Sequence, residues 1–303
     1  MTLIASVNGR ETIWVLADRR ISWPAPQPPR DDAQKVLLLR TVDGLAILGN
    51  SGLGITAHGT EPSAWMQKVL RRQALPLEES LSVLAEAMER ELPQHLGQLP
   101  PEQRTHAVLA PSYYGGWEGS VLRVYSIDLL QCPKHRLHFV VRRNDMANTG
   151  APNPVMAAGS GGKTLLQLLE RPEWRSPLRR MVKASAQGRI SAHTLADYLA
   201  RLNYEVHKNN SSVGPRCIVV WRHRLGGTRF GGGYLYYTGT AREHDTSQLS
   251  LMPPLVDAGV AGFIRVWNRH MAHELGKPVD ETLESETNVA LGLPAQFPEE
   301  KLR

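Results

Sequence analysis

The sequence has little cysteine, few aromatic residues and no long apolar run, and each shortage excludes a class of protein. Its 303 residues include 2 Cys, and aromatic residues make up 6%. Cys132 and Cys217 are too few for a disulfide framework or a cysteine metal site, so we expect two buried thiols. No apolar stretch approaches the roughly 20 residues of a membrane helix. The start MTLIASVNGRETIW also lacks the features of a signal peptide, which predicts a cytoplasmic protein with no membrane partner.

Positive charge is in modest excess, but it is not concentrated. Lys and Arg number 35 against 29 Asp and Glu, which gives a formal net charge of +6. The excess is spread over pairs such as Arg19-Arg20 and Arg179-Arg180. A nucleic-acid-binding protein usually gathers such residues into one stripe with interleaved aromatics. The scatter therefore favours solvated or subunit-contact positions and predicts no nucleic-acid partner.

The predicted elements alternate between runs of strands and pairs of helices. Residues 2–7 and 12–17 are β-rich runs around the turn Asn8-Gly9, which is a strong hairpin signal. Further strands are predicted at 36–39, 44–48, 106–110, 120–127, 136–142, 216–222 and 233–238. Helices are predicted at 61–73, 77–95, 163–170, 191–207 and 257–274. This order is typical of sheets packed face to face and covered by helices.

Polar residues stand at the edges of the first four predicted strands. Thr2 follows the initiator methionine and is small enough for that methionine to be removed. Asp18 ends the second strand, Lys35 opens the third, and Gly49 lies in a Gly-Asn-Ser-Gly turn after the fourth.

These residue types fit the chemistry of an N-terminal nucleophile. A free N-terminal Thr supplies a hydroxyl that attacks and an α-amine, with a pKa near 8, that accepts its proton. An ammonium such as that of Lys35 lowers the pKa of the amine and of the hydroxyl, and a carboxylate such as that of Asp18 holds the ammonium in place. The N–H of Gly49 is a candidate oxyanion donor.

Several segments together resemble the proteasome β-subunit family, the N-terminal-threonine branch of the Ntn hydrolases, which includes the simpler HslV-type bacterial peptidases. They are TLIASV, WVLADRRIS, DDAQKVLLL, GLAILGNSG, VLRVYSID and MAAGSGG. The resemblance covers about residues 2–222. It implies an α+β fold, the four-layer αββα sandwich, with a hydrolase domain over 1–225 and a C-terminal extension over 226–303 packed on or between subunits. It also implies a homo-oligomeric ring, a possible ATP-dependent unfoldase partner, and no cofactor or metal.

The resemblance assigns roles to individual residues. The implied catalytic residues are Thr2, Asp18, Lys35 and Gly49, with Ser160 and Ser211 as supporting serines. The implied substrate-binding residues are Arg20, Ser22 and Asn50. The sequence departs from the family's pattern three positions before the second serine, where an acidic residue is usual and Lys208 stands, or Asn209 if the register slips by one; HslV-type members lack this acid too.

The function predicted is that of a threonine-type peptidase or amidohydrolase that cleaves peptide or amide bonds through a Thr2 acyl-enzyme. An alternative is a catalytically inactive Ntn-fold scaffold or ring subunit that binds partners, which Lys208 and the extension motivate.

Two other motifs have weaker functional interpretations. Residues 157–164 (AAGSGGKT) are a relaxed phosphate-loop match that includes Lys163, but GAPNPVM before them is a poor strand, so a tight strand-to-helix corner is favoured. His270, His273 and Glu274 do not have zincin spacing and are expected on the exposed face of the last helix. The aromatic residues expected in the core or in subunit contacts are Trp221, Tyr234, Tyr236 and Tyr237.

Overall fold

The computed structural model describes residues 2–21, 28–55, 59–71, 75–97, 99, 104–114, 121–131, 137–144, 155–224, 232–243, 253, 255–257 and 278. Its helices are α1 Pro62–Leu70, α2 Leu77–Glu91, α3 Pro93–Leu96, α5 Ser160–Glu170, α6 Pro172–Ala186 and α7 Ala192–Asn209. Its strands are β1 Ile4–Asn8, β2 Thr12–Asp18, β3 Val36–Arg40, β4 Gly44–Ser51, β5 Ala107–Tyr114, β6 Val121–Gln131, β7 Leu137–Asn144, β8 Val155–Ala158, β9 Arg216–His223, β10 Gly232–Thr238, β11 Ala241–Arg242 and β12 Leu255–Asp257.

The first sheet is built around the N-terminal hairpin. Within the described residues its strand order is β11-β10-β9-β2-β1-β8. β1 and β2 pair antiparallel from Ile4 opposite Ala17 to Asn8 opposite Ile13, as the Asn8-Gly9 turn predicts. Every residue of β2 is buried. The hairpin strands β1 and β2 thus have one face against helices and the other against the second sheet.

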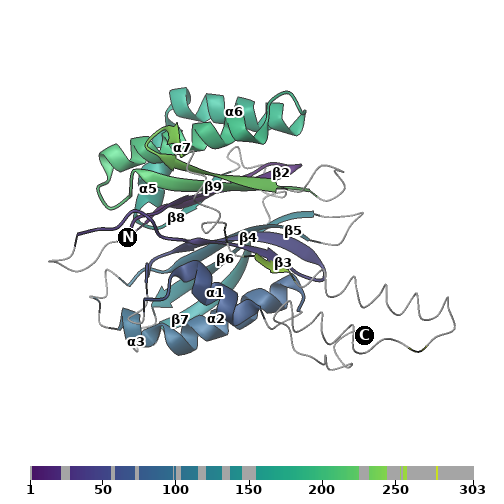
Figure 1. Ribbon diagram of the computed structural model, residues 1–303, viewed down its shortest axis with the longest axis vertical. Helices are drawn as coiled ribbons and strands as arrows, with labels where there is room; N and C mark the ends of the chain where they lie inside the picture. Colours follow the sequence, from purple (N-terminus) through teal and green to yellow (C-terminus); the bar gives the residue numbers. More distant parts are fainter. Residues whose placement is uncertain are drawn as a thin grey trace.

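The second sheet has the order β12-β3-β4-β5-β6-β7 in the described part of the chain. Its neighbours pair antiparallel except for β12, which runs parallel to β3. Figure 1 shows α5, α6 and α7 above the first sheet and α1, α2 and α3 below the second.

The apolar side chains form three clusters that follow this arrangement. One lies between the sheets and joins Ile4 and Val15 of the first sheet to Val36 and Ile47 of the second. Another packs α5, α6 and α7 on the first sheet, and the third packs α1, α2 and α3 on the second. Packing of the cluster between the sheets sets their relative position. Ends of strands from both sheets therefore meet at the site described below.

The predicted fold class has to be corrected. The sequence predicts a four-layer αββα Ntn-hydrolase sandwich with a C-terminal extension, whereas the structure is a mixed α+β fold of two sheets and helices. Residues assigned to the extension supply β10 and β11 to the first sheet and β12 to the second. Because β12 is parallel to β3, the second sheet is mixed. Sequence periodicity cannot reveal such pairing, since these short strands gain their stability from the sheet edges they join.

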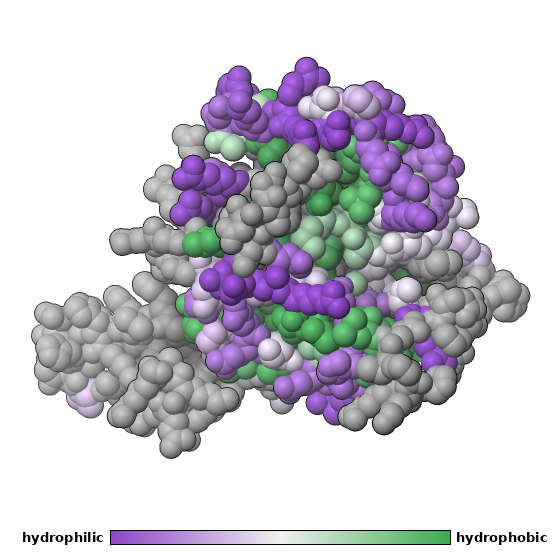
Figure 2. Space-filling model, turned by 180° about the vertical axis from the view of Figure 1, so that it is seen from behind, coloured by the Kyte–Doolittle hydropathy of each residue, from purple (hydrophilic) through white to green (hydrophobic). Residues whose placement is uncertain are grey.

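Some element boundaries also differ from the prediction. The predicted helix 77–95 divides at Pro93, which has no amide hydrogen for α2. Helix α6 and strand β8 were not predicted. In α6 only Leu178 is buried, so the apolar stripe that would mark an amphipathic helix is narrow. Figure 2 shows hydrophilic residues gathered over this top end of the molecule.

Other predictions concern single residues. Cys217 is a buried free thiol, as predicted, while Cys132 lies outside the described residues. Trp221, Tyr236 and Tyr237 are buried, and Tyr234 packs against the cluster between the sheets. The predicted helix 257–274, with its histidines, lies outside the described residues.

Two kinds of feature are absent from the described residues. None of the helices there has the length and apolar character needed to cross a bilayer. No group of three or more His, Cys, Asp or Glu side chains in that part of the chain is arranged to hold a metal ion.

Candidate active site

The candidate site forms where the start of β1, the end of β2 and the start of β3 meet. Thr2 precedes β1, Asp18 is the last residue of β2, and Lys35 is the residue before β3. The backbone N–H of Asp18 donates to the carbonyl of Leu3 at 3.0 Å, which continues the hairpin ladder to its end. The N–H of Asn50 donates to the carbonyl of Lys35 at 2.9 Å and fixes Lys35 to the second sheet. The site therefore bridges the two sheets.

Thr2, Asp18 and Lys35 contact one another directly. The Thr2 hydroxyl donates to Oδ1 of Asp18 in a short hydrogen bond. Nζ of Lys35 lies 2.5 Å from Oγ1 of Thr2 and 3.1 Å from Oδ1 of Asp18. The same Nζ donates to the carbonyl of Arg20 at 2.6 Å. The Asp18 carboxylate and the Arg20 carbonyl thus hold the Lys35 ammonium against the hydroxyl oxygen of Thr2.

Backbone amides hold the Asp18 carboxylate in place. Oδ1 accepts from the N–H of Leu3 at 2.7 Å, and Oδ2 accepts from the N–H groups of Arg20 and Gly214, each at 3.1 Å. Asp18 is 0% exposed, yet both its oxygens are hydrogen-bonded. Hydrogen bonds to both oxygens fix the position of this buried carboxylate.

Burial and charge act in opposite directions on Lys35. Its side chain is 2% exposed, and burial lowers the pKa of the ammonium below its ordinary value. The neighbouring Asp18 carboxylate raises that pKa part of the way back. The result is an amine that gives up its proton more readily than a surface lysine, next to a hydroxyl oxygen.

A chain of polar side chains lies on the other side of the Thr2 backbone. The hydroxyl of Ser160, at the start of α5, lies 3.5 Å from the carbonyl oxygen of Thr2 and 2.7 Å from the hydroxyl of Ser212. The Ser212 hydroxyl donates to Oδ1 of Asn210 at 2.6 Å. The serine that contacts Ser160 is therefore Ser212, one position after the predicted Ser211. The run Asn-Asn-Ser-Ser gave no means of choosing between the two.

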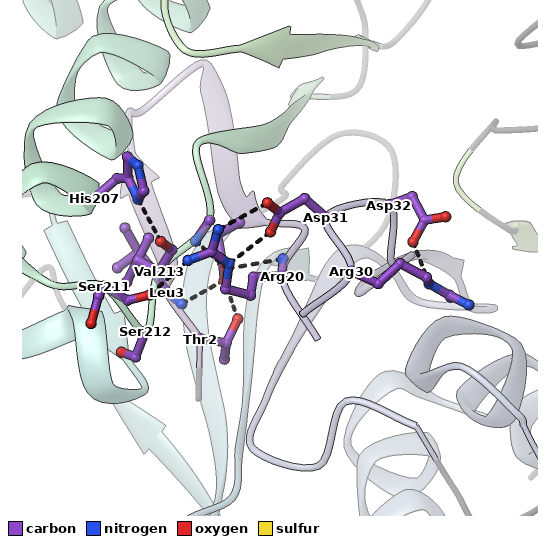
Figure 3. Close-up of polar contacts among 12 residues, drawn as sticks. Thr2, Leu3, Arg20, Arg30, Asp31, Asp32, His207, Ser211, Ser212 and Val213 are labelled. Atoms are coloured by element: carbon purple, nitrogen blue, oxygen red, sulfur yellow. Dashed lines mark hydrogen bonds and ion pairs between the residues drawn. The ribbon is translucent and has the colours of Figure 1, made fainter. Parts of the chain in front are cut away.

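Ser211 and Arg20 have another role in the structure. Arg20 donates to both oxygens of Asp31, at 2.8 and 2.9 Å, and to the carbonyl of Ser211 at 2.6 Å (Figure 3). The bond to Asp31 raises the pKa of the Arg20 guanidinium. Arg20 thus ties the loop before Lys35 to the turn after α7. It was predicted to bind substrate, and the structure shows it engaged with these groups.

Gly49, Asn50 and Ser22 complete the predicted set. Gly49 lies inside β4, opposite Val36 of β3, and not in a turn after the strand. A Cβ at Gly49 would lie 2.6 Å from Ile4, so glycine is needed for the two sheets to approach. Asn50 is buried and donates to the carbonyl of Leu53 at 3.3 Å. Ser22 lies outside the described residues.

The corner between β8 and α5 uses its amides within the fold. The N–H of Gly161 donates to the carbonyl of Thr2 at 3.2 Å, and the N–H of Gly162 donates to that of Gly159 at 2.9 Å. A phosphate loop needs such amides free for its ligand. Although β8 does precede the corner, this arrangement does not favour the nucleotide-binding interpretation of Lys163.

We predict that Gly159→Ala destabilises the protein by about 2 kcal/mol or more. Gly159 has φ +85°, and a Cβ there would lie 2.2 Å from the Thr2 carbonyl oxygen. Gly188 also has positive φ, +66°, but nothing lies within 4 Å of its added Cβ. Gly188→Ala is thus the matched control, because it carries the cost of a positive φ without a steric clash. Urea unfolding of both variants measures the difference, and equal losses would contradict the close approach of Thr2.

The comparisons with known proteins give structural neighbours only. No family model and no curated protein matches this chain. Solved structures similar to it include Anbu proteins. A Gly-1 mutant of Anbu from Hyphomicrobium sp. strain MC1 has 14% identity over 90% of this chain and 100% of its own, with a TM-score of 0.49. Anbu from Yersinia bercovieri, described as an ancestral beta-subunit, has 12% identity over 91% of this chain and 97% of its own, with a TM-score of 0.46.

A further neighbour is the helical assembly of the Anbu complex from Pseudomonas aeruginosa, with 12% identity over 90% of this chain and 95% of its own and a TM-score of 0.49. These findings correct the resemblance stated from the sequence, because the neighbours are Anbu proteins and not HslV-type peptidases. With every TM-score below 0.5, we argue function from the geometry of the site alone.

Proposed function

We propose that this protein is a hydrolase of peptide or amide bonds whose nucleophile is the hydroxyl of Thr2. The observation that carries the proposal is the buried contact of Thr2 Oγ1 with Lys35 Nζ, 2.5 Å away, and with the Asp18 carboxylate. A hydroxyl, an amine with a lowered pKa and an orienting carboxylate are the parts that nucleophilic catalysis requires.

The proposal requires cleavage of the peptide bond before Thr2. In the uncut chain Thr2 is 2% exposed, and its nitrogen is part of an amide and not basic. Cleavage would create an α-amine in the same residue as the hydroxyl. An amine with a pKa near 8 is a competent base close to neutral pH.

The reaction then runs in two steps. The α-amine takes the hydroxyl proton as Oγ1 bonds to the substrate's carbonyl carbon, and the resulting ammonium returns a proton to the leaving nitrogen as the C–N bond breaks. Water then adds to the Thr2 ester and releases the carboxylic acid and the free hydroxyl. Both steps pass through an oxyanion that needs a positioned N–H donor. The N–H of Gly49 remains the candidate predicted for this role.

Lys35 and Asp18 act as a unit in this scheme. The ammonium of Lys35 lowers the cost of developing negative charge on Oγ1, because it is 2.5 Å away and shielded from water. Asp18 balances the ammonium and is itself held by three backbone amides. The scheme needs no metal or organic cofactor.

The mass of the intact purified protein tests the proposal. It is measured before and after incubation with an epoxyketone or a β-lactone, electrophiles that react with N-terminal threonines. We expect a chain that begins at Thr2 and gains one adduct on that residue. A chain that begins at Thr2 and gains no adduct would overturn the proposal and favour a scaffold that binds partners.

The predicted homo-oligomeric ring and the ATP-dependent unfoldase partner stay predictions. Light scattering of the purified chain tests the first, because a ring has a mass that is a whole multiple of 33.6 kDa. The unfoldase partner can be tested only after such an assembly has been found.

A further inference from the structure

The buried guanidinium of Arg19 contacts the segment that leads into Lys35. Arg19 directly follows Asp18, the last residue of β2, and its side chain is buried. Its Nη2 donates to the carbonyl of Asp32 at 2.9 Å, and its Nε donates to the carbonyl of Ala33 at 3.4 Å. The N–H of Ala33 in turn donates to the carbonyl of Arg19 at 3.0 Å. One residue at the end of the first sheet thus holds two of the residues that precede Lys35.

Two side chains from the strands after residue 225 stabilise this buried charge. The ring of Tyr236, in β10, lies against the guanidinium, with its centroid 4.6 Å from Cζ of Arg19. Oε2 of Glu243, the residue after β11, lies 3.7 Å from Nη1 of Arg19. The face of an aromatic ring attracts a cation within about 6 Å, and the attraction is stronger where water is excluded. A buried arginine depends on such partners, because an unpaired charge in the interior is costly.

Tyr236 also contacts the segment before Lys35 directly. Its hydroxyl accepts a hydrogen bond from Nε2 of Gln34, the residue immediately before Lys35, at 2.5 Å. Its carbonyl accepts from the N–H of Glu243 at 2.9 Å, so the two partners of Arg19 are fixed to each other. The three residues before Lys35 are therefore each bonded either to Arg19 or to Tyr236.

The position of Lys35 matters because its ammonium acts at short range. Nζ lies 2.5 Å from Oγ1 of Thr2, at the end of a flexible side chain. The carbonyl of Lys35 is anchored to the second sheet by the N–H of Asn50. The segment before Lys35 supplies the anchor on the other side. A displacement of about 1 Å can cost about a hundredfold in rate where reacting groups must meet.

We propose that Tyr236 and Glu243 are positioning residues, which hold Lys35 against the Thr2 hydroxyl by fixing Arg19. Both side chains act through Arg19 and the segment that it holds, and not on the reacting atoms. The inference rests on the function proposed above, because it concerns the ammonium that acts on the nucleophile. It gives a role in the site to strands after residue 225, to which the family resemblance assigned none.

The test is the rate at which a β-lactone labels Thr2, followed by intact mass over a range of β-lactone concentrations. In Tyr236→Leu the ring face and the hydroxyl are both lost, so we expect the maximal labelling rate to fall about tenfold. The concentration that gives half of this rate should stay within about twofold, since Lys35 acts on the nucleophile and not on binding of the reagent.

Tyr236→Phe separates the ring face from the hydroxyl. It keeps the ring over Arg19 and loses only the bond to Gln34, so its maximal labelling rate should stay within about threefold of wild type. A rate as low as that of Tyr236→Leu would exclude the contact with Arg19 as the cause.

Tyr237→Leu is the matched control. Tyr237 is the next residue of β10, is also buried, and packs with the helices on the other face of the first sheet. Its hydroxyl donates to Oδ1 of Asp197 at 2.9 Å. Removing this ring also costs packing, but it leaves Arg19 and its partners in place, so the maximal labelling rate should not change. An equal loss of rate in both leucine variants would overturn the inference, because packing alone would then explain it.

Glu243→Gln keeps the inference falsifiable if Tyr236→Leu does not fold. The amide fills the space of the carboxylate but carries no charge, so the maximal labelling rate should fall about threefold. An unchanged maximal rate in either variant would overturn the role of that residue, as would a change in the half-maximal concentration alone. If the wild-type protein is not labelled at all, the proposed function itself fails; if it is labelled and the variants match it, only the role of Tyr236 and Glu243 fails.

Discussion

Replacing Thr2 with Ala should abolish amide hydrolysis and electrophile labelling while the chain stays folded. The change removes the only hydroxyl that contacts both Lys35 and Asp18 in the described structure. Loss of a nucleophile costs at least about 10³-fold in rate. The fold should survive, because Asp18 keeps its bonds to the N–H of Leu3 and to Lys35. We expect a stability loss of about 1–2 kcal/mol, measured by urea unfolding.

Two further variants make this experiment decisive. Thr2→Ser keeps a hydroxyl and an amine and should keep labelling and turnover. Thr12→Ala makes the same chemical change at a buried threonine of β2, whose hydroxyl bonds Nδ1 of His223 at 2.7 Å, away from the site. It should lose stability and keep activity. Turnover of a fluorogenic peptide pool by Thr2→Ala at the wild-type rate would exclude Thr2 as the nucleophile.

Asp18→Asn should destabilise the protein by about 3–5 kcal/mol, because it leaves the buried ammonium of Lys35 without its anion. The two side chains are 0% and 2% exposed, so water cannot replace the lost partner. The new amide nitrogen would also face either the N–H of Leu3, which now donates to Oδ1, or the N–H groups of Arg20 and Gly214, which now donate to Oδ2. Urea unfolding near pH 7.5 measures the effect.

The double variant Asp18→Asn, Lys35→Met separates charge from shape. Methionine fills similar space without a charge, so the pair should be more stable than Asp18→Asn alone. That recovery of stability is expected without recovery of activity. If the double variant is the less stable of the two, the cost of Asp18→Asn comes from its backbone hydrogen bonds and not from the unpaired ammonium.

Thr2, Asp18 and Lys35 were predicted as one group from their residue types at strand edges and from the family resemblance, and only the hairpin part of this grouping is local. The Asn8-Gly9 turn sets the register of the first hairpin, and that register places Asp18 beside Leu3. Strand β3 begins after Lys35, and its packing across the interface between the two sheets brings Lys35 to Thr2 and Asp18. Short-range turn chemistry accounts for the hairpin, whereas the place of Lys35 in the group came from the resemblance.

The rest of the site depends on contacts that no local pattern encodes. Ser212 and Ser211 are neighbours with the same side chain, and only the turn after α7 decides which faces Ser160. Gly214 contacts Asp18 through its backbone N–H, and a glycine has no side chain that could indicate such a contact in the sequence. Gly49 looked like a turn residue from its neighbours, but it lies within β4, where an added Cβ would clash with Ile4 of the other sheet.

The fold was less predictable at its edges than at its centre. Strand β8 is short and follows two prolines, so its pairing with β1 supplies the stability that its own sequence lacks. The strands β11 and β12 are shorter still. The family resemblance rested on the N-terminal segments, where local patterns are strong, and it named the wrong relatives.

The order in which the chain is synthesised has a consequence for the Asp18 carboxylate. One of its hydrogen-bond donors, Gly214, lies 196 positions later in the sequence, and Ser160 is 158 positions after Thr2. At 5–20 residues per second, a ribosome would need on the order of ten seconds or more to deliver the second half of the site after the first. Thr2 and Asp18 therefore leave the ribosome long before the groups that complete their surroundings. On the proposed function, a nascent chain would carry its nucleophile in an inactive form until the chain has folded as far as Gly214.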